Sequence, residues 1–104
     1  VNIEQVPVLP ETVELLQQKC YPGGTNRNLS YLEKNINIEK IHSLRKATAL
    51  QLICDPQTSG GILTAVDPAG LDKFLNSLKL HKIPSPSVIG ELESSDGDIL
   101  CELI

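Results

Sequence analysis

The sequence predicts an α+β fold, in which a mixed, mainly antiparallel sheet of about four strands packs against helices. Short apolar runs with β-branched residues predict strands, and longer segments with an apolar residue at every third or fourth position predict helices. These segments follow one another in the order strand, helix, loop, helix, strand, helix, strand, strand. This order is typical of the α+β class, with helices on at least one face of the sheet.

Length and composition bound the fold further. The chain has 104 residues, which predicts a single domain, 1–104, with no room for a second core. Hydrophobic residues make up 40% and charged residues 21%, which is the balance of a globular protein. With one Phe, two Tyr and no Trp, the core must be aliphatic.

The first third of the chain predicts a strand, a helix and a loop. Residues 1–6 alternate apolar and polar side chains and predict a short strand, which Pro7 ends. A helix is predicted from Pro10 to the Pro-Gly-Gly tripeptide at 22–24, because its apolar residues fall at helical spacing. Residues 23–40 are polar and rich in Asn, which predicts a loop with one helical turn around Leu29.

The middle of the chain predicts two helices with a central strand between them. Residues 41–53 carry an apolar side chain at roughly every third position and predict a helix that ends before Pro56. The apolar run 62–66 predicts a central strand. Asp67 is the expected N-cap of the helix 68–80, which has proline as its first residue.

The last quarter predicts a β-hairpin. Residues 88–92 form one strand, residues 94–97 form the turn, and residues 99–103 pair back as the final strand.

Residues 54–61, Cys-Asp-Pro-Gln-Thr-Ser-Gly-Gly, are the first segment that could carry chemistry. Two adjacent glycines let backbone amides approach a ligand closely, and the Thr-Ser pair before them adds hydroxyl donors. Such a turn can form an anion-binding nest, and Asp55 could hold a cation or cap the turn. A purely structural turn into a buried strand explains the same residues.

Residues 22–28, Pro-Gly-Gly-Thr-Asn-Arg-Asn, are the second such segment. Glycines next to a threonine and an arginine have the composition of a phosphate cradle. The alternative is a helix stop followed by a solvated loop. His42 and His81 are isolated, and no carboxylate pair, catalytic triad or zinc ligand set can be recognised.

The net charge, the cysteines and the first residue indicate the partners and the cellular compartment of the protein. The net charge of −4 argues against nucleic acid and against a basic membrane-binding face, and no apolar run approaches the length of a membrane span. Three widely spaced cysteines favour the reducing cytoplasm. The chain has no methionine and begins with valine, so we expect it to be part of a longer protein.

The two loops together carry a resemblance to a known family. The segment CDPQTSGG followed by ILTAV resembles the DPQTSGG segment and apolar strand of the selenophosphate synthetases (selenide, water dikinases). Residues 22–32, PGGTNRNLSYL, are similar to their PGGTxRNxxY segment. Residues 6–16, VPVLPETVELL, resemble the strand and helix before it, and residues 89–92 resemble the closing strand. The match spans nearly the whole chain in the right order.

The resemblance implies a fold, a reaction and partners. Selenophosphate synthetases belong to the superfamily of aminoimidazole ribonucleotide synthetase, whose subunits have two α/β domains and form homodimers. This chain would be the C-terminal domain, with its own N-terminal domain as partner and no nucleic acid or membrane. The whole enzyme would use ATP, selenide and water, with Mg2+, to make selenophosphate, AMP and phosphate for selenocysteine and selenouridine synthesis in the cytoplasm.

The resemblance also implies what this part of the enzyme lacks. The family's reactive Cys or selenocysteine, its lysine and its magnesium aspartates lie in N-terminal segments. ATP and Mg2+ would therefore bind mainly outside this chain, which would be inactive alone and would wall the active-site cleft. No catalytic residue and no metal ligand is assigned here. The candidate phosphate-binding or cleft-lining residues are Gly23, Gly24, Thr25, Arg27, Asn28, Asp55, Thr58, Ser59, Gly60 and Gly61.

Two alternatives stay open. The first is another enzyme of the same superfamily, of the hydrogenase-maturation or thiamine-phosphate kinase type, since these share the PQTSGG turn loosely. The second is a noncatalytic binding domain that folds alone.

Overall fold

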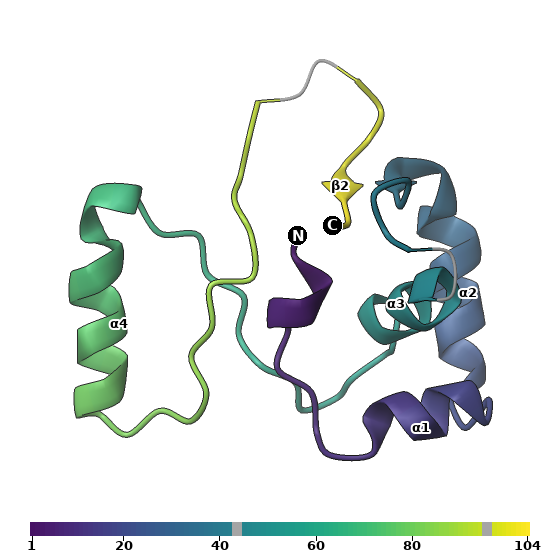
Figure 1. Cartoon of the computed structure of the whole chain (residues 1–104), viewed down its shortest axis with the longest axis horizontal. Helices are drawn as coiled ribbons and strands as arrows, with labels where there is room; N and C mark the ends of the chain where they lie inside the picture. Colours follow the sequence, from purple (N-terminus) through teal and green to yellow (C-terminus); the bar gives the residue numbers. More distant parts are fainter. Residues whose placement is uncertain (43–44, 95–96) are drawn as a thin grey trace.

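The computed structural model describes residues 1–42, 45–94 and 97–104. Three helices gather on one side of the molecule, α4 lies apart on the other side, and long extended stretches run between them (Figure 1). The helices and strands of the described residues are η1 (Ile3–Gln5), α1 (Thr12–Gln17), α2 (Gly23–Leu32), η2 (Glu33–Asn35), β1 (Ile36–Asn37), α3 (Lys46–Ile53), η4 (Pro68–Gly70), α4 (Leu71–Leu80) and β2 (Cys101–Glu102).

The predicted sheet of about four mainly antiparallel strands is wrong. Among the described residues one sheet is formed, by β1 and β2, and its two strands run parallel. Ile36 pairs with Cys101 and Asn37 with Glu102. The chain is therefore still an α+β protein, but with a far smaller sheet.

The physical reason is that an apolar run becomes a strand only when another strand pairs with it. Within the described residues, 62–66 and 88–92 are not part of any sheet. Residues 99–103 contain β2, but β2 pairs with β1 rather than with 88–92. The turn expected at 94–97 includes residues 95 and 96, which lie outside the described residues.

Residues 1–3 form backbone hydrogen bonds with the end of the chain, on the side of β2 that faces away from β1. The N–H of Ile104 donates to the carbonyl of Val1 at 2.9 Å, and the N–H of Ile3 donates to the carbonyl of Ile104 at 3.0 Å. On the other side of this segment, away from β2, the N–H of Asn2 donates to the carbonyl of Ile89 at 2.7 Å. Both chain ends consequently lie side by side in the middle of the molecule (Figure 1).

The hydrophobic core lies between α3, β2 and the N-terminal residues. Leu103 is fully buried and packs with Ile41 and Ala49, which are also buried. Half-buried aliphatic and sulfur side chains surround this cluster: Val1, Ile3, Ile36, Ile38, Leu50, Ile53 and Cys101. The expected aliphatic core is confirmed, and it depends on contacts between the two ends of the chain.

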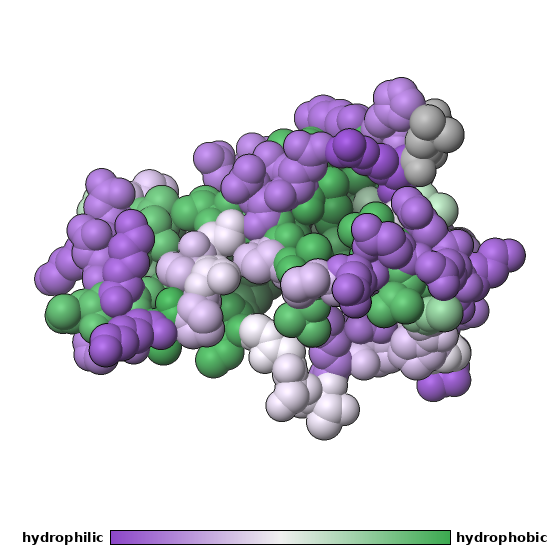
Figure 2. All heavy atoms as spheres, turned by 60° about the horizontal axis from the view of Figure 1, so that its bottom comes forward, coloured by the Kyte–Doolittle hydropathy of each residue, from purple (hydrophilic) through white to green (hydrophobic). Residues whose placement is uncertain are grey.

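The predicted helix at 68–80 is confirmed as a short η4 turn that continues into α4. Asp67 caps it as expected, because its carboxylate accepts a hydrogen bond from the N–H of Ala69 at 2.8 Å. The apolar stripe of α4 is only half-buried, and no residue of this helix is buried. Hydrophobic residues stay open to solvent on this side of the molecule (Figure 2).

Three segments in the first half of the chain differ from their predicted structure. Residues 1–6, expected to form a strand, contain the 3-10 helix η1 instead. The loop expected at 23–40 contains the ten-residue helix α2 and the strand β1. The helix expected at 41–53 begins later, at Lys46, and residues 43 and 44 lie outside the described residues. In the described part of the chain, no helix is long and apolar enough to cross a membrane.

Candidate functional site

The structure brings the two glycine-containing segments of the sequence together. The N-terminal turn of α2 lies against the turn that follows α3. The hydroxyl of Thr25 donates to Oδ1 of Asp55 at 3.4 Å, and the side-chain amide of Asn28 donates to the carbonyl of Cys54 at 2.9 Å. We call this contact the α2–α3 junction; it consists of Thr25 and Asn28 of α2 and of Cys54 and Asp55 after α3.

Each polar side chain in the α2–α3 junction has a structural partner. Thr25 is fully buried, so its hydroxyl contacts Asp55 and not solvent. Cys54 ends α3, and its carbonyl is one of the groups that a helix leaves without an internal partner. Asn28 supplies that partner. These hydrogen bonds hold the beginning of α2 against the end of α3.

At Gly24 the backbone of α2 packs tightly against Pro56, next to the α2–α3 junction. A Cβ placed on Gly24 would lie 2.7 Å from Cγ of Pro56, which is closer than real Cβ atoms come to another heavy atom. A Cβ placed on Gly23 would meet no atom within 4 Å. The second glycine of the Pro-Gly-Gly tripeptide is therefore required by packing, and the first is not.

We expect Gly24→Ala to lower the free energy of unfolding by about 1–3 kcal/mol, since the added methyl group forces α2 away from Pro56. Gly23→Ala is the matched control. Without a clash, it should raise the free energy of unfolding by up to about 1 kcal/mol through reduced chain entropy in the unfolded state. Urea denaturation followed by circular dichroism measures both. Equal effects of the two substitutions would contradict the assigned packing.

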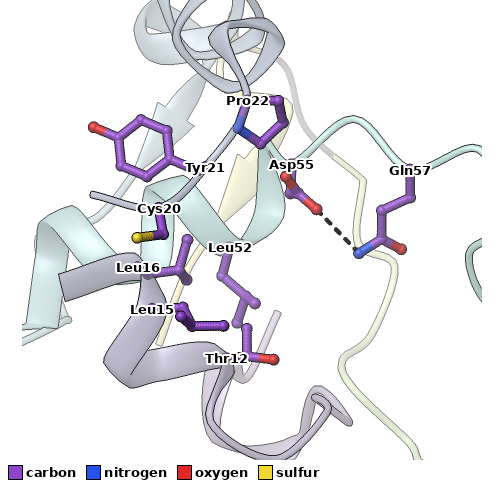
Figure 3. A pocket seen from close by; sticks show the side chains of 9 residues that line it. All are labelled: Thr12, Leu15, Leu16, Cys20, Tyr21, Pro22, Leu52, Asp55 and Gln57. Atoms are coloured by element: carbon purple, nitrogen blue, oxygen red, sulfur yellow. Dashed lines mark hydrogen bonds between the residues drawn. The ribbon is translucent and has the colours of Figure 1, made fainter. Parts of the chain in front are cut away.

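A cavity of about 210 Å³ opens beside the α2–α3 junction. Aliphatic side chains of α1 and α3 line one part of it, and Asp55 and Gln57 lie at another part, joined by a hydrogen bond of 3.4 Å (Figure 3). The lining residues are Thr12, Leu15, Leu16, Cys20, Tyr21, Pro22, Leu52, Asp55 and Gln57. Its lining is mixed, and its volume is smaller than the roughly 300–1,000 Å³ that is typical of small-molecule sites.

Most of these lining residues have no signal in the sequence. Leu15, Leu16 and Leu52 occupy ordinary positions of amphipathic helices, and Tyr21 stands alone between a helix and a proline. Gln57 belongs to the octet 54–61, but its side chain gave no reason to expect a contact with Asp55. Only the fold shows that these residues share one cavity.

The remaining candidate residues lie outside the α2–α3 junction contacts. Residues 58–61 are exposed and make no hydrogen bond in the described part of the chain. Arg27 is exposed on α2. None of the described glycines has a positive φ, so the Gly-Gly turn does not use the left-handed conformations that only glycine adopts readily. Gly60 and Gly61 are exposed; a Cβ placed on Gly60 would lie 2.7 Å from Oε1 of Gln57, whereas one on Gly61 would meet no described atom within 4 Å.

The cysteines and the acidic residues form no further site in the described part of the chain. Burial raises the pKa of the Cys54 thiol, which disfavours the reactive thiolate. No group of three or more His, Cys, Asp or Glu side chains there is arranged to hold a metal ion.

Comparison with known proteins shows which proteins this chain resembles in sequence. No protein-family model and no solved structure matches it. The chain is 38% identical over 103 residues to the selenide, water dikinase of Shewanella sp. (strain ANA-3), covering 96% of this chain and 27% of that protein. It is 39% identical over 105 residues to the selenide, water dikinase of Photobacterium profundum, covering 99% and 28%. The same enzyme of Photorhabdus laumondii is 38% identical over 105 residues, with 98% and 28% covered.

The matched region is a C-terminal portion of these proteins, and the chain spans little more than a quarter of their length. The similarity includes the α2–α3 junction, because the alignments cover nearly all of the chain. By sequence, therefore, the chain is similar to a C-terminal portion of proteins named selenide, water dikinase.

Proposed function

We propose that this chain is the C-terminal part of an enzyme that converts selenide, ATP and water into selenophosphate, AMP and phosphate. The observation that carries this proposal is the identity of 38–39% over 96–99% of the chain to proteins named selenide, water dikinase. The whole enzyme would supply selenophosphate for selenocysteine and selenouridine. It would work as a homodimer in the cytoplasm, which suits the free cysteines Cys20, Cys54 and Cys101.

ATP and Mg2+ are the nucleotide and the metal ion of this proposed reaction. Asp55 is the carboxylate of the α2–α3 junction, and its two oxygens already accept hydrogen bonds from Thr25 and Gln57. A magnesium site usually needs several oxygen ligands, and no suitable group of side chains is found among the described residues. Because the described residues offer no such group, we propose that Mg2+ is bound mainly by the remaining part of the enzyme.

The proposed role of this chain is to wall the active-site cleft. The loop 58–61 and the Arg27 side chain are exposed parts of the two glycine-containing segments and are open to a ligand. Backbone amides of such a loop can bind phosphate oxygens, and a guanidinium can bind them bidentately. Thr25, Asn28 and Asp55 would act as positioning residues, because they hold the start of α2 against the end of α3 from which the loop leaves.

The activity is tested on the longer protein that contains this chain. Incubation with ATP, MgCl2 and selenide should release AMP and give selenophosphate in equal amounts, measured by chromatography and by 31P NMR. The 104-residue chain alone should form neither product. The enzyme of Photobacterium profundum serves as the positive control. If that enzyme is active and the folded longer protein releases no AMP, the proposed function is wrong.

A further inference from the structure

Two extended segments of this chain lack the partners that their sequences require. The backbone of residues 58–66 and of residues 90–94 makes no hydrogen bond in the described part of the chain. The side chains of Ile62, Leu63 and Leu92 are 94%, 82% and 86% exposed. Unpaired backbone groups next to exposed aliphatic side chains are typical of strands whose neighbouring strands are missing.

The exposed side chains cover both faces of the first segment. Ile62 and Leu63 are consecutive, and consecutive side chains of an extended chain point to opposite faces. Both edges of residues 58–66 are also free of hydrogen bonds within the described residues. One pairing contact along one edge would therefore leave most of this surface in water.

The backbone around Val1 shows which polypeptide lies next to the second segment. The N–H of Asn2 donates to the carbonyl of Ile89, and a Cβ placed on Gly90 would lie 3.0 Å from Cα of Val1. The first residues and residues 88–92 run in opposite directions (Figure 1). In antiparallel strands, two residues that face each other without a mutual hydrogen bond are flanked by two backbone hydrogen bonds. Val1 and Gly90 form such a pair, and the bond from Asn2 to Ile89 is one of the two.

The other of these two hydrogen bonds needs a residue before Val1. In an antiparallel ladder the second hydrogen bond of the same pair runs from the N–H of Glu91 to the carbonyl of the residue preceding Val1. The N–H of Glu91 has no partner in the described part of the chain. The relatives contain the required polypeptide, because this chain spans only 27–28% of their length and matches a C-terminal portion.

We propose that the polypeptide preceding Val1 continues as a strand antiparallel to residues 91–93, and that this polypeptide covers the bare segments 62–66 and 90–94, while the loop 58–61 stays open. A second copy of this chain is a poorer occupant, because a symmetric contact would pair one edge of each segment and leave the other edges free. The proposal rests on backbone geometry and does not depend on the reaction that the enzyme catalyses.

The position of the new strand is tested with a disulfide in the longer protein. In the expected register, the second residue before Val1 lies directly opposite Leu92 in a non-hydrogen-bonded pair, on the same face as Val1 and Gly90. Cysteines at these two positions should form a disulfide under mild oxidation, in a background with Cys20→Ser and Cys101→Ser. Mass spectrometry of the linked tryptic peptides measures the yield.

The matched control moves one cysteine by one residue. Leu92→Cys combined with a cysteine at the third residue before Val1 places the two side chains on opposite faces, so its disulfide yield should be about tenfold lower. Equal yields from the two variants, or a higher yield from the control, would overturn the proposal.

Hydrogen exchange on unmodified protein gives a test that needs no variant to fold. The amide of Glu91 should exchange about a hundredfold more slowly in the longer protein than in the 104-residue chain. Exchange at the same rate in both proteins would overturn the proposal. So would slow exchange in the shorter chain that is lost on dilution, because that result would identify a second copy as the occupant.

Discussion

Replacing Leu103 with alanine should lower the free energy of unfolding of the chain by about 3 kcal/mol. Leu103 is fully buried and packs with Ile41 and Ala49, and its N–H donates to the carbonyl of Asn37 at 2.8 Å. The substitution removes most of a fully buried core side chain and leaves a cavity between α3 and β2. Because small domains are stable by only about 5–15 kcal/mol, this loss is a large fraction of the total.

Leu100→Ala is the matched control for this experiment. Leu100 precedes the same strand, makes a backbone hydrogen bond to Asn35 and has a side chain that is 77% exposed. The same chemical change there should cost less than about 0.5 kcal/mol. Urea denaturation of the two variants and the unsubstituted chain, followed by circular dichroism, gives the comparison. Similar losses at both positions would contradict the placement of the core.

The second large effect is expected on activity. In the longer enzyme, Gly61→Val should lower kcat/KM for selenophosphate formation by about a hundredfold, if the loop 58–61 contacts the phosphate groups as proposed. A Cβ at this position meets no atom of the described residues within 4 Å, and its φ is not positive. The substitution should therefore leave the thermal unfolding temperature unchanged. Loss of activity without loss of stability would then report on contact with a ligand.

Gly70→Val provides the control, because a Cβ there also meets no atom within 4 Å and the residue lies at the start of α4. Its activity should stay within about twofold of the unsubstituted enzyme, because it lies outside the segments assigned to the cleft. If the folded Gly61→Val enzyme keeps full activity, the loop only connects α3 to the following segment and the cleft-lining role is wrong.

The helices with strong local signals could be predicted from the sequence. The Asp67-Pro68 start and the apolar stripe led to the correct assignment of α4, because caps and periodicity act within one helix. α2 was missed because its sequence is poor in helix-forming residues: it starts with two glycines and contains two asparagines. Its contacts with Cys54 and Asp55 stabilise it, and such contacts are not visible in a local pattern.

The strands could not be predicted in the same way. Apolar alternation indicates that a segment is suited to a sheet, but it does not identify the partner. Residues 62–66 have the most strand-like sequence of the chain and have no partner among the described residues. β1 lies in a segment rich in Asn and still pairs, because Cys101 and Glu102 lie beside it.

The candidate site was predicted in part. The sequence indicated both glycine-containing segments, and the structure shows that 22–28 meets the first residues of 54–61. The sequence did not show that the contacts join Thr25 to Asp55 and Asn28 to Cys54, leaving residues 58–61 exposed. A motif specifies which residue types are present, whereas burial decides which of them can still reach a ligand.

We expect the hydrogen bonds between residues 1–3 and 102–104 to form late in folding. The amine of Val1 donates to the carbonyl of Glu102, 101 positions away in the sequence. Closing a flexible loop of this length costs about 4 kcal/mol of chain entropy, whereas each helix closes only local turns. We therefore expect the helices to form first and the contacts between these two distant segments to limit the folding rate. Until that step is complete, Leu103 has no core to enter, so the chain remains exposed to misfolding for as long as its ends stay apart.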